Sequence, residues 1–118
     1  MGILALGDIG KAIARRAHGF GMTVQAVDRY PKPWPPIVSE VGELDRLDEL
    51  LSISDWFVIA APLTPETRGL VDRRRVALLK EGVYVIVISR GNIMEEEALI
   101  DGLRSDRIAG AGLDVTAA

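Results

Sequence analysis

The sequence contains no cysteine, a single histidine and few aromatic residues. The lack of cysteine excludes disulfides, thiolate nucleophiles and cysteine-based zinc sites, and one histidine cannot build a His-rich metal site, so we expect no metal. No apolar run reaches the roughly 18 to 20 residues that cross a bilayer. Met1 leads directly into a strand-like pattern, without the charged segment of a signal peptide. We therefore expect a cytoplasmic protein that does not bind a membrane.

Basic residues are also scarce relative to acidic ones, with 14 Lys and Arg against 17 Asp and Glu and a net charge of −3. They are scattered along the chain, which argues against a nucleic-acid partner. One basic run, Arg73–Arg75, falls in a segment with helical periodicity. Three successive helical residues point in three directions, so we favour a solvent-exposed face over a phosphate-binding patch.

Apolar periodicity divides the 118 residues into alternating strand-like and helix-like segments. The expected strands are 2–6, 22–27, 56–60, 83–88 and 108–115. The expected helices are 9–20, 44–51, 72–80 and 94–104. The strand at 83–88 is apolar on both faces, which is typical of a central parallel strand covered by helices on two sides. The alternation predicts an α/β fold, a doubly wound parallel sheet of about five strands in a single three-layer domain.

A glycine-containing turn, Ala5–Gly10, follows the first strand with the sequence Ala-Leu-Gly-Asp-Ile-Gly. It is a variant of the GxGxxG dinucleotide fingerprint in which alanine replaces the first glycine. Gly7 would let the backbone approach a pyrophosphate, Gly10 would allow close helix–strand packing, and the helix N-terminus would attract the anion. Alanine at position 5 predicts a turn without positive φ there. The alternative is that the glycines serve only a tight strand–helix turn.

Two acidic residues lie near this turn. We expect the Asp8 side chain to point to solvent, while the backbone N–H groups of Asp8 and Ile9 face the ligand. Asp28 follows the second strand, 18 residues after Gly10, where a carboxylate can accept hydrogen bonds from the adenosine ribose and repel a 2′-phosphate. We therefore expect NAD, with NADP less favoured, although Arg29 could partly offset the repulsion. The alternative for Asp28 is a carboxylate that only caps its loop.

Three later segments add specificity: Pro-Leu-Thr-Pro-Glu-Thr at Pro62–Thr67, Ser-Arg-Gly at Ser89–Gly91, and Arg-Ile-Ala-Gly-Ala-Gly-Leu-Asp-Val at Arg107–Val115. With the glycine turn, in this order, they resemble the D-isomer-specific 2-hydroxyacid dehydrogenase family over essentially the whole chain. The resemblance implies a Rossmann-type NAD-binding domain of an oxidoreductase that transfers hydride between NAD(H) and a small 2-hydroxy or 2-keto acid. Ala60 and Val87 depart from the family, which often has histidine and a polar residue there.

The resemblance also implies roles for individual residues. The family's Ser-Arg-Gly arginine binds the substrate carboxylate and polarises the carbonyl that accepts hydride, which gives Arg90 the catalytic role. The alternative for Arg90 is a surface arginine that follows a strand. Asp114 would accept a hydrogen bond from the nicotinamide carboxamide. The expected cofactor contacts, from the fingerprint and the resemblance together, are Gly7, Asp8, Ile9, Gly10, Asp28, Ala61, Pro62, Thr67, Ile88, Ser89 and Asp114.

The family completes its site with a glutamate soon after Leu-Asp-Val and a later histidine, and this chain contains neither. His18 falls late in the first helix, away from the strand ends, and Glu95–Glu97 is typical of an acidic first helical turn. The family's substrate domain comes from sequence on both flanks of the cofactor domain. We therefore expect residues 1–118 to be a truncated or excised dinucleotide-binding domain that turns over little or no substrate alone.

Two other interpretations remain open. One is a non-catalytic NAD-sensing or dimerisation module, because a fold does not fix a function. The other is a different Rossmann dehydrogenase with a similar cofactor half. The family usually dimerises through this domain, so we also expect a homodimer.

Overall fold

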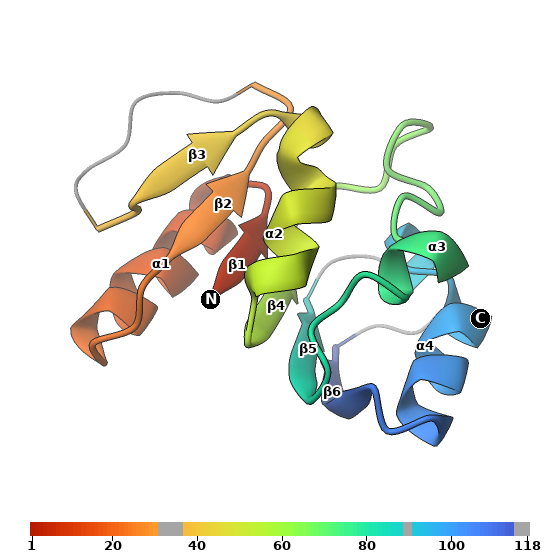
Figure 1. Ribbon diagram of the computed structural model, residues 1–118. Coiled ribbons are helices and arrows are strands. Elements are labelled where there is room, and N and C mark those ends of the chain that lie inside the picture. Colours follow the sequence, from red (N-terminus) through yellow and green to blue (C-terminus); the bar gives the residue numbers. More distant parts are fainter. Residues whose placement is uncertain (31–36, 89–90, 115–118) are drawn as a thin grey trace.

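The computed structural model describes residues 1–30, 37–88 and 91–114, and within them six parallel strands form one sheet. The strands lie in the order β3-β2-β1-β4-β5-β6 (Figure 1). Their bounds are β1 (Gly2–Leu4), β2 (Gln25–Val27), β3 (Glu40–Gly42), β4 (Trp56–Ile59), β5 (Val83–Val87) and β6 (Ile108–Leu113). This is the order of a doubly wound Rossmann sheet, whose connections reverse direction between β1 and β4. The predicted fold class is confirmed.

Helices lie on both faces of the sheet, as the alternating pattern predicted. The α-helices are α1 (Asp8–Gly19), α2 (Leu47–Ile53), α3 (Arg73–Val76) and α4 (Glu96–Arg104), and short 3-10 turns lie at Leu44–Arg46 and Gly91–Ile93. α1 lies on one face, and α2, α3 and α4 lie on the other (Figure 1). None of the helices in the described ranges is both long and apolar enough to span a membrane.

Two apolar cores, one on each face, fix these layers. On the α1 face, Ala14 and Ala17 of the helix pack against buried strand residues, and their small side chains bring the helix close to the sheet. The residues of this core in the strands are Ile3, Ala26 and Val58, and Val24 joins them from just before β2. On the opposite face, Leu47 and Leu51 of α2 and Leu99 of α4 pack in the larger core. Its strand residues include Leu4, Phe57, Ile59, Val83, Val85 and Val87.

The structure differs from the predicted elements at β3 and α3. β3 is a three-residue edge strand beside β2 with an exposed glutamate and no fully buried residue, so it lacks the apolar alternation that would reveal it. Asp72 caps α3 as predicted, because its Oδ1 accepts a hydrogen bond of 3.0 Å from Arg75 N. The predicted continuation to Lys80 is wrong. Beyond this helix the backbone hydrogen bonds span three residues instead of four, as in a 3-10 turn: Leu79 N donates to the Val76 carbonyl at 3.1 Å.

Candidate functional site

A cleft of about 490 Å³ opens at the carboxyl ends of β1, β2 and β4. Its walls come mainly from the segments that follow these three strands, together with Lys11 of α1, Val41 of β3 and Leu44 of the next 3-10 turn. In an open α/β sheet, this edge beside the reversal of connection is where ligands bind, and the volume suits a small organic ligand. The predicted site residues that line the cleft are Gly7, Asp28, Ala61, Pro62 and Thr67.

Gly7 and Gly10 have different structural roles. A Cβ on Gly10 would lie 2.3 Å from the Ala5 carbonyl oxygen, so packing of α1 against the turn requires glycine there. A Cβ on Gly7 would meet no atom within 4 Å, and the φ of Gly7 is −75°, which any residue adopts. The chain itself therefore does not require glycine at position 7. The tight-turn alternative accounts for Gly10 but not for Gly7, which lines the cleft.

The N-terminus of α1 begins at this turn. Gly7 is its N-cap residue, and among the described residues no side chain caps the helix. The first N–H groups of a helix have no intrahelical acceptor, and with the helix dipole they favour an anion. The side chains of Asp8 and Ile9 are exposed, the latter by 59%. The exposure of Asp8 agrees with the expectation that its side chain points to solvent.

The predicted conformation of Ala5 is wrong, because its φ is +77°. Two hydrogen bonds of 2.7 Å hold the chain in this left-handed conformation: Ala5 N donates to the Val27 carbonyl, and Leu6 N donates to Asp28 Oδ2. A single non-glycine residue in this region costs on the order of 1 kcal/mol, which the surrounding contacts can offset. The turn therefore keeps the geometry of the glycine fingerprint without its first glycine.

Asp28 caps its loop with both carboxylate oxygens. Oδ2 accepts the 2.7 Å bond from Leu6 N, and Oδ1 accepts one of 2.9 Å from Tyr30 N. The alternative that Asp28 caps its loop is therefore correct. Each carboxylate oxygen has a second acceptor position, and the half-buried side chain lines the cleft. Asp28 can thus cap the loop and still accept hydrogen bonds from a ligand.

The loop after β4 is held by its own threonines. Thr67 Oγ1 donates to the Pro62 carbonyl at 2.7 Å and accepts a bond of 2.7 Å from Thr64 N. Ala61 is buried and lines the cleft, and its methyl side chain can offer a ligand no hydrogen bond. These bonds give one wall of the cleft a defined shape without any ligand.

Sequence reasoning missed one feature of the cleft, an ion pair between Arg29 and Glu66. The two residues follow β2 and β4, line the cleft and lie 37 positions apart in the sequence. The Arg29 guanidinium also lies 5.1 Å from the centre of the Tyr30 ring. No spacing rule in the sequence signals such a pair, since it depends on the order of the strands.

The remaining predicted residues follow β5 and β6. Ile88 is half-buried, and its N–H donates to the Ile59 carbonyl at 3.3 Å. Asp114 is exposed, and its N–H donates to the Val87 carbonyl at 3.0 Å. Both therefore lie at the same sheet edge as the cleft without lining it. Ser89 and Arg90, the predicted cofactor contact and catalytic residue, lie outside the described residues.

His18 and the acidic run Glu95–Glu97 lie where they were expected. His18 is exposed in the last turn of α1. Glu95 precedes α4, and the next two glutamates form its first turn. None of the three glutamates lines the cleft, so the acidic run has no catalytic geometry here.

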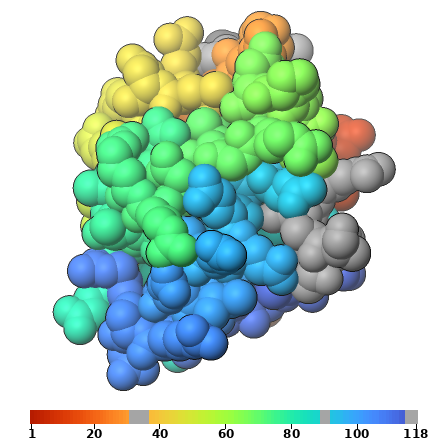
Figure 2. All heavy atoms as spheres, turned by 90° about the vertical axis from the view of Figure 1, so that its right-hand side faces the viewer, coloured from red at the N-terminus to blue at the C-terminus, as the bar shows by residue number. Residues whose placement is uncertain are grey.

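The arginines of Arg73–Arg75 bind acidic side chains of neighbouring helices. Arg73 pairs with Glu97 and Asp101 of α4, which lies beside α3 (Figure 2). Arg74 and Arg75 both bind Asp48 of α2, at 3.1 and 2.9 Å. These hydrogen bonds, from Arg74 first and then Arg75, hold the pKa of Asp48 below its usual value. The run joins helices and does not form a phosphate-binding patch.

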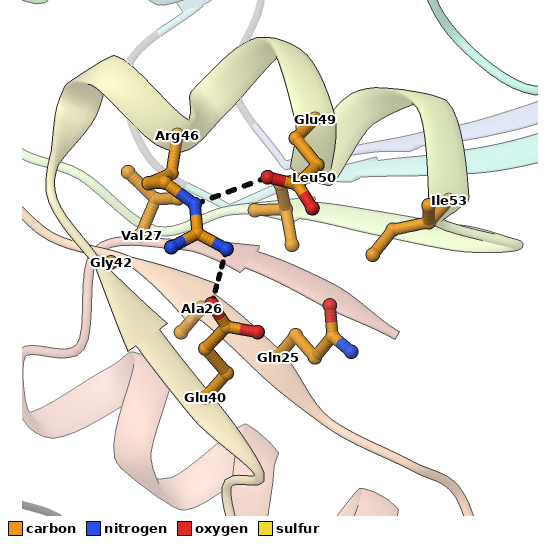
Figure 3. A pocket seen from close by; sticks show the side chains of 9 residues that line it. All are labelled: Gln25, Ala26, Val27, Glu40, Gly42, Arg46, Glu49, Leu50 and Ile53. Carbon is orange, nitrogen blue, oxygen red and sulfur yellow. Dashed lines mark hydrogen bonds and ion pairs between the residues drawn. The ribbon is translucent and has the colours of Figure 1, made fainter.

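Two other hollows are less suitable as sites. One, of about 20 Å³, lies where Arg46 binds Glu40 and Glu49, and it has room for about one water molecule (Figure 3). The other, of about 630 Å³, lies by Met1, Thr23 and Trp56 at the amino ends of the strands. Ligands of doubly wound sheets bind at the opposite edge.

Comparison with known proteins agrees with this geometry. Residues 1–118 match the family model described as "D-isomer specific 2-hydroxyacid dehydrogenase, NAD binding domain". A glyoxylate reductase of Thermococcus onnurineus is 46% identical, and the match covers 98% of this chain and 34% of the relative. A hydroxypyruvate reductase of Blautia hydrogenotrophica is 43% identical, and the match covers 98% of this chain and 35% of that relative. The chain thus spans about a third of these curated relatives.

A solved structure supports the same family assignment. It is a D-isomer specific 2-hydroxyacid dehydrogenase from Xanthobacter autotrophicus Py2 in complex with NADPH and MES. Its similarity gives a TM-score of 0.94 at 42% identity, over 100% of this chain and 37% of that one.

Proposed function

The chain belongs to the NAD binding domain family of the D-isomer specific 2-hydroxyacid dehydrogenases, and from that premise we propose that it binds NAD(H), in preference to NADP(H), in the cleft beside β1. The observation that carries the proposal is the open space at Gly7, next to the uncapped N-terminus of α1. That space lets backbone N–H groups approach a pyrophosphate. Asp28 lines the same cleft with acceptor capacity left for ribose hydroxyls.

Different segments along the carboxyl edge of the sheet contact different parts of the cofactor. In this proposal Gly7 to Gly10 hold the pyrophosphate, Asp28 binds the adenosine ribose, and the loop Ala61–Thr67 forms the adjacent wall. Ile88, Ser89 and Asp114 follow β5 and β6 and contact the nicotinamide end, with Asp114 accepting a hydrogen bond from the carboxamide.

The substrate that we propose for the larger protein is a small 2-hydroxy or 2-keto acid, the class to which the names of the curated relatives refer. A bound nicotinamide supplies or accepts the hydride. Arg90 binds the substrate carboxylate with paired N–H donors and stabilises negative charge on the carbonyl oxygen. His18 is exposed at the end of α1 and cannot move the proton. We therefore expect little or no turnover from these 118 residues alone.

A fluorescence titration of the chain with NADH tests the proposal. We expect saturable binding, and NAD⁺ should compete for the same site. Gly7→Val, which fills the open space, should abolish saturation. Gly19→Val is the matched control, because a Cβ on Gly19 also meets no atom within 4 Å and Gly19 lies at the other end of α1. Equal binding by both variants would contradict the site, and robust glyoxylate reduction by the chain would contradict the expected lack of turnover.

We also propose that the chain forms a homodimer through the half of the sheet that α1 leaves open. Trp56 and Tyr84 stack there with ring centres 4.6 Å apart, and they are 38% and 43% exposed. Gly110, beside the Tyr84 ring, adds no covering side chain. Parallel sheets are normally buried on both faces, so a second copy would cover this apolar surface.

Sedimentation velocity at tens of micromolar tests the dimer. We expect a dimer for the wild type and a monomer for Tyr84→Glu. Phe20→Glu is the control, because Phe20 is also an exposed aromatic residue, at 86%, but follows α1 and is not part of the Trp56–Tyr84 stack. A monomeric wild type would refute the dimer.

A further inference from the structure

The ion pair between Arg29 and Glu66 connects the two sides of the cleft. The two side chains are half-exposed, at 49% and 51%. Arg29 comes directly after Asp28, the acid proposed to bind the adenosine ribose, and its guanidinium lies against the Tyr30 ring. Glu66 belongs to the loop that the bonds between Thr64 and Thr67 hold in shape. The carboxylate is therefore presented from a defined wall.

The charges at this end of the cleft decide which adenosine ligands fit. A 2′-phosphate on the ribose would lie beside Asp28, whose negative charge opposes it. Arg29 is the adjacent residue whose planar N–H donors could bind that phosphate. In the structure, however, Arg29 Nη1 donates a hydrogen bond to Glu66 Oε2, and the negative charge of Glu66 offsets that of the guanidinium. Lys11 also lines the cleft, from α1 on the other side of the turn.

We infer that Glu66 sets the preference for NAD over its 2′-phosphorylated form by holding Arg29, and is a positioning residue that determines coenzyme specificity. The inference rests on the proposed binding of the adenosine half in this cleft. The pair is solvent-exposed, so it holds Arg29 only weakly, and a change at Glu66 should release it. Released, Arg29 can turn to the ribose and add a charge-assisted hydrogen bond to the phosphate.

The test uses two probes that contain only the adenosine end: adenosine 5′-monophosphate and adenosine 2′,5′-bisphosphate. Calorimetry gives the Kd of each for the wild-type chain and for Glu66→Gln, which keeps the shape of the side chain and removes its charge. We expect the bisphosphate to bind about tenfold more tightly to Glu66→Gln, the effect of one charge-assisted hydrogen bond in a half-exposed site. The Kd of the monophosphate should change by less than about twofold, because that ligand has no 2′-phosphate.

Two further variants separate a specific effect from a general one. Glu81→Gln removes the same charge from an exposed residue before β5, at the opposite edge of the sheet, and should leave both Kd values unchanged. In Arg29→Ala, adding Glu66→Gln should no longer improve bisphosphate binding. A gain that persists without Arg29 would assign the effect to Lys11 or to net charge, and would overturn the inference.

The outcomes also separate this inference from the proposed function. If the wild type binds the monophosphate but Glu66→Gln leaves the ratio of the two Kd values unchanged, the role of Glu66 is wrong and the site stands. If neither probe binds the wild type or the variants, the proposed site fails, and the inference fails with it.

Discussion

The two glycines of the phosphate turn should separate stability from binding when each is replaced by alanine. Gly10→Ala places a Cβ 2.3 Å from the Ala5 carbonyl oxygen, and real Cβ atoms essentially never come within 3.0 Å of another atom. The turn or the start of α1 must therefore shift. Overpacking of this kind costs about 1 to 3 kcal/mol. For a domain of this size that lowers Tm by about 4 °C for each kcal/mol.

Gly7→Ala should have the opposite profile. Its Cβ enters open space at a φ of −75°. Alanine is a poorer N-cap than glycine, but it reduces the entropy of the unfolded chain, and the two effects of about 0.5 to 1 kcal/mol oppose each other. We expect a Tm within about 2 °C of wild type. The methyl group would occupy the place where a pyrophosphate approaches the backbone, so NADH affinity should fall about tenfold or more.

Thermal unfolding followed by circular dichroism, together with NADH titration of both variants, measures this separation. The reasoning is refuted if Gly7→Ala binds NADH like the wild type, or if Gly10→Ala is as stable as the wild type. A Gly7→Ala variant that loses stability would show that the chain itself needs glycine there. The tight-turn explanation would then cover both residues.

Two further predictions concern aspartates. Asp28→Ala should lower stability by about 1 to 3 kcal/mol, because Leu6 N and Tyr30 N lose their acceptors. It should also weaken NAD more than NADP in calorimetric titration, because the remaining acceptor positions of the carboxylate bind ribose hydroxyls while its charge repels a 2′-phosphate. Equal weakening of both would contradict the ribose role. Asp48→Asn should destabilise the fold at pH 7 by less than about 1 kcal/mol, seen as a lower Tm, because solvent reaches Asp48 and Arg74 and screens the interaction, although Arg75 is only 23% exposed. The folded-state pKa of Asp48 is depressed, so its contribution to stability is present above its usual pKa of 3.8 and is lost as pH falls through the folded pKa. The Tm difference should therefore shrink as pH falls below 3.8, and a difference that does not shrink there would contradict the ion-pair explanation.

The layers of the fold could be predicted from the sequence because each depends on a local pattern. The strand at Val83–Val87 has the apolar faces of a buried parallel strand, and the helix that begins at Asp8 follows a turn with two glycines. β3 could not be predicted, because a short edge strand with exposed residues needs no apolar alternation. Its pairing with β2 depends on how distant segments come together in the folded sheet, which the local sequence does not show.

The site was only partly predictable for the same reason. The fingerprint located Gly7 and Asp28, because their spacing follows from one strand–helix–strand unit. The positive φ of Ala5 was missed, since its stabilising hydrogen bonds come from Val27 and Asp28 in another part of the chain. Glu66 was missed because its contact with Arg29 depends on strands that are distant in sequence.

The central claim is that a dinucleotide binds at the carboxyl edge of β1. Amide chemical shifts of the labelled chain, recorded by NMR as NAD⁺ is added, test it most directly. We expect the largest shift changes at Gly7–Gly10, Asp28–Tyr30 and Ala61–Thr67. Changes concentrated instead at Met1, Thr23 and Trp56, beside the hollow at the amino ends of the strands, would contradict the account.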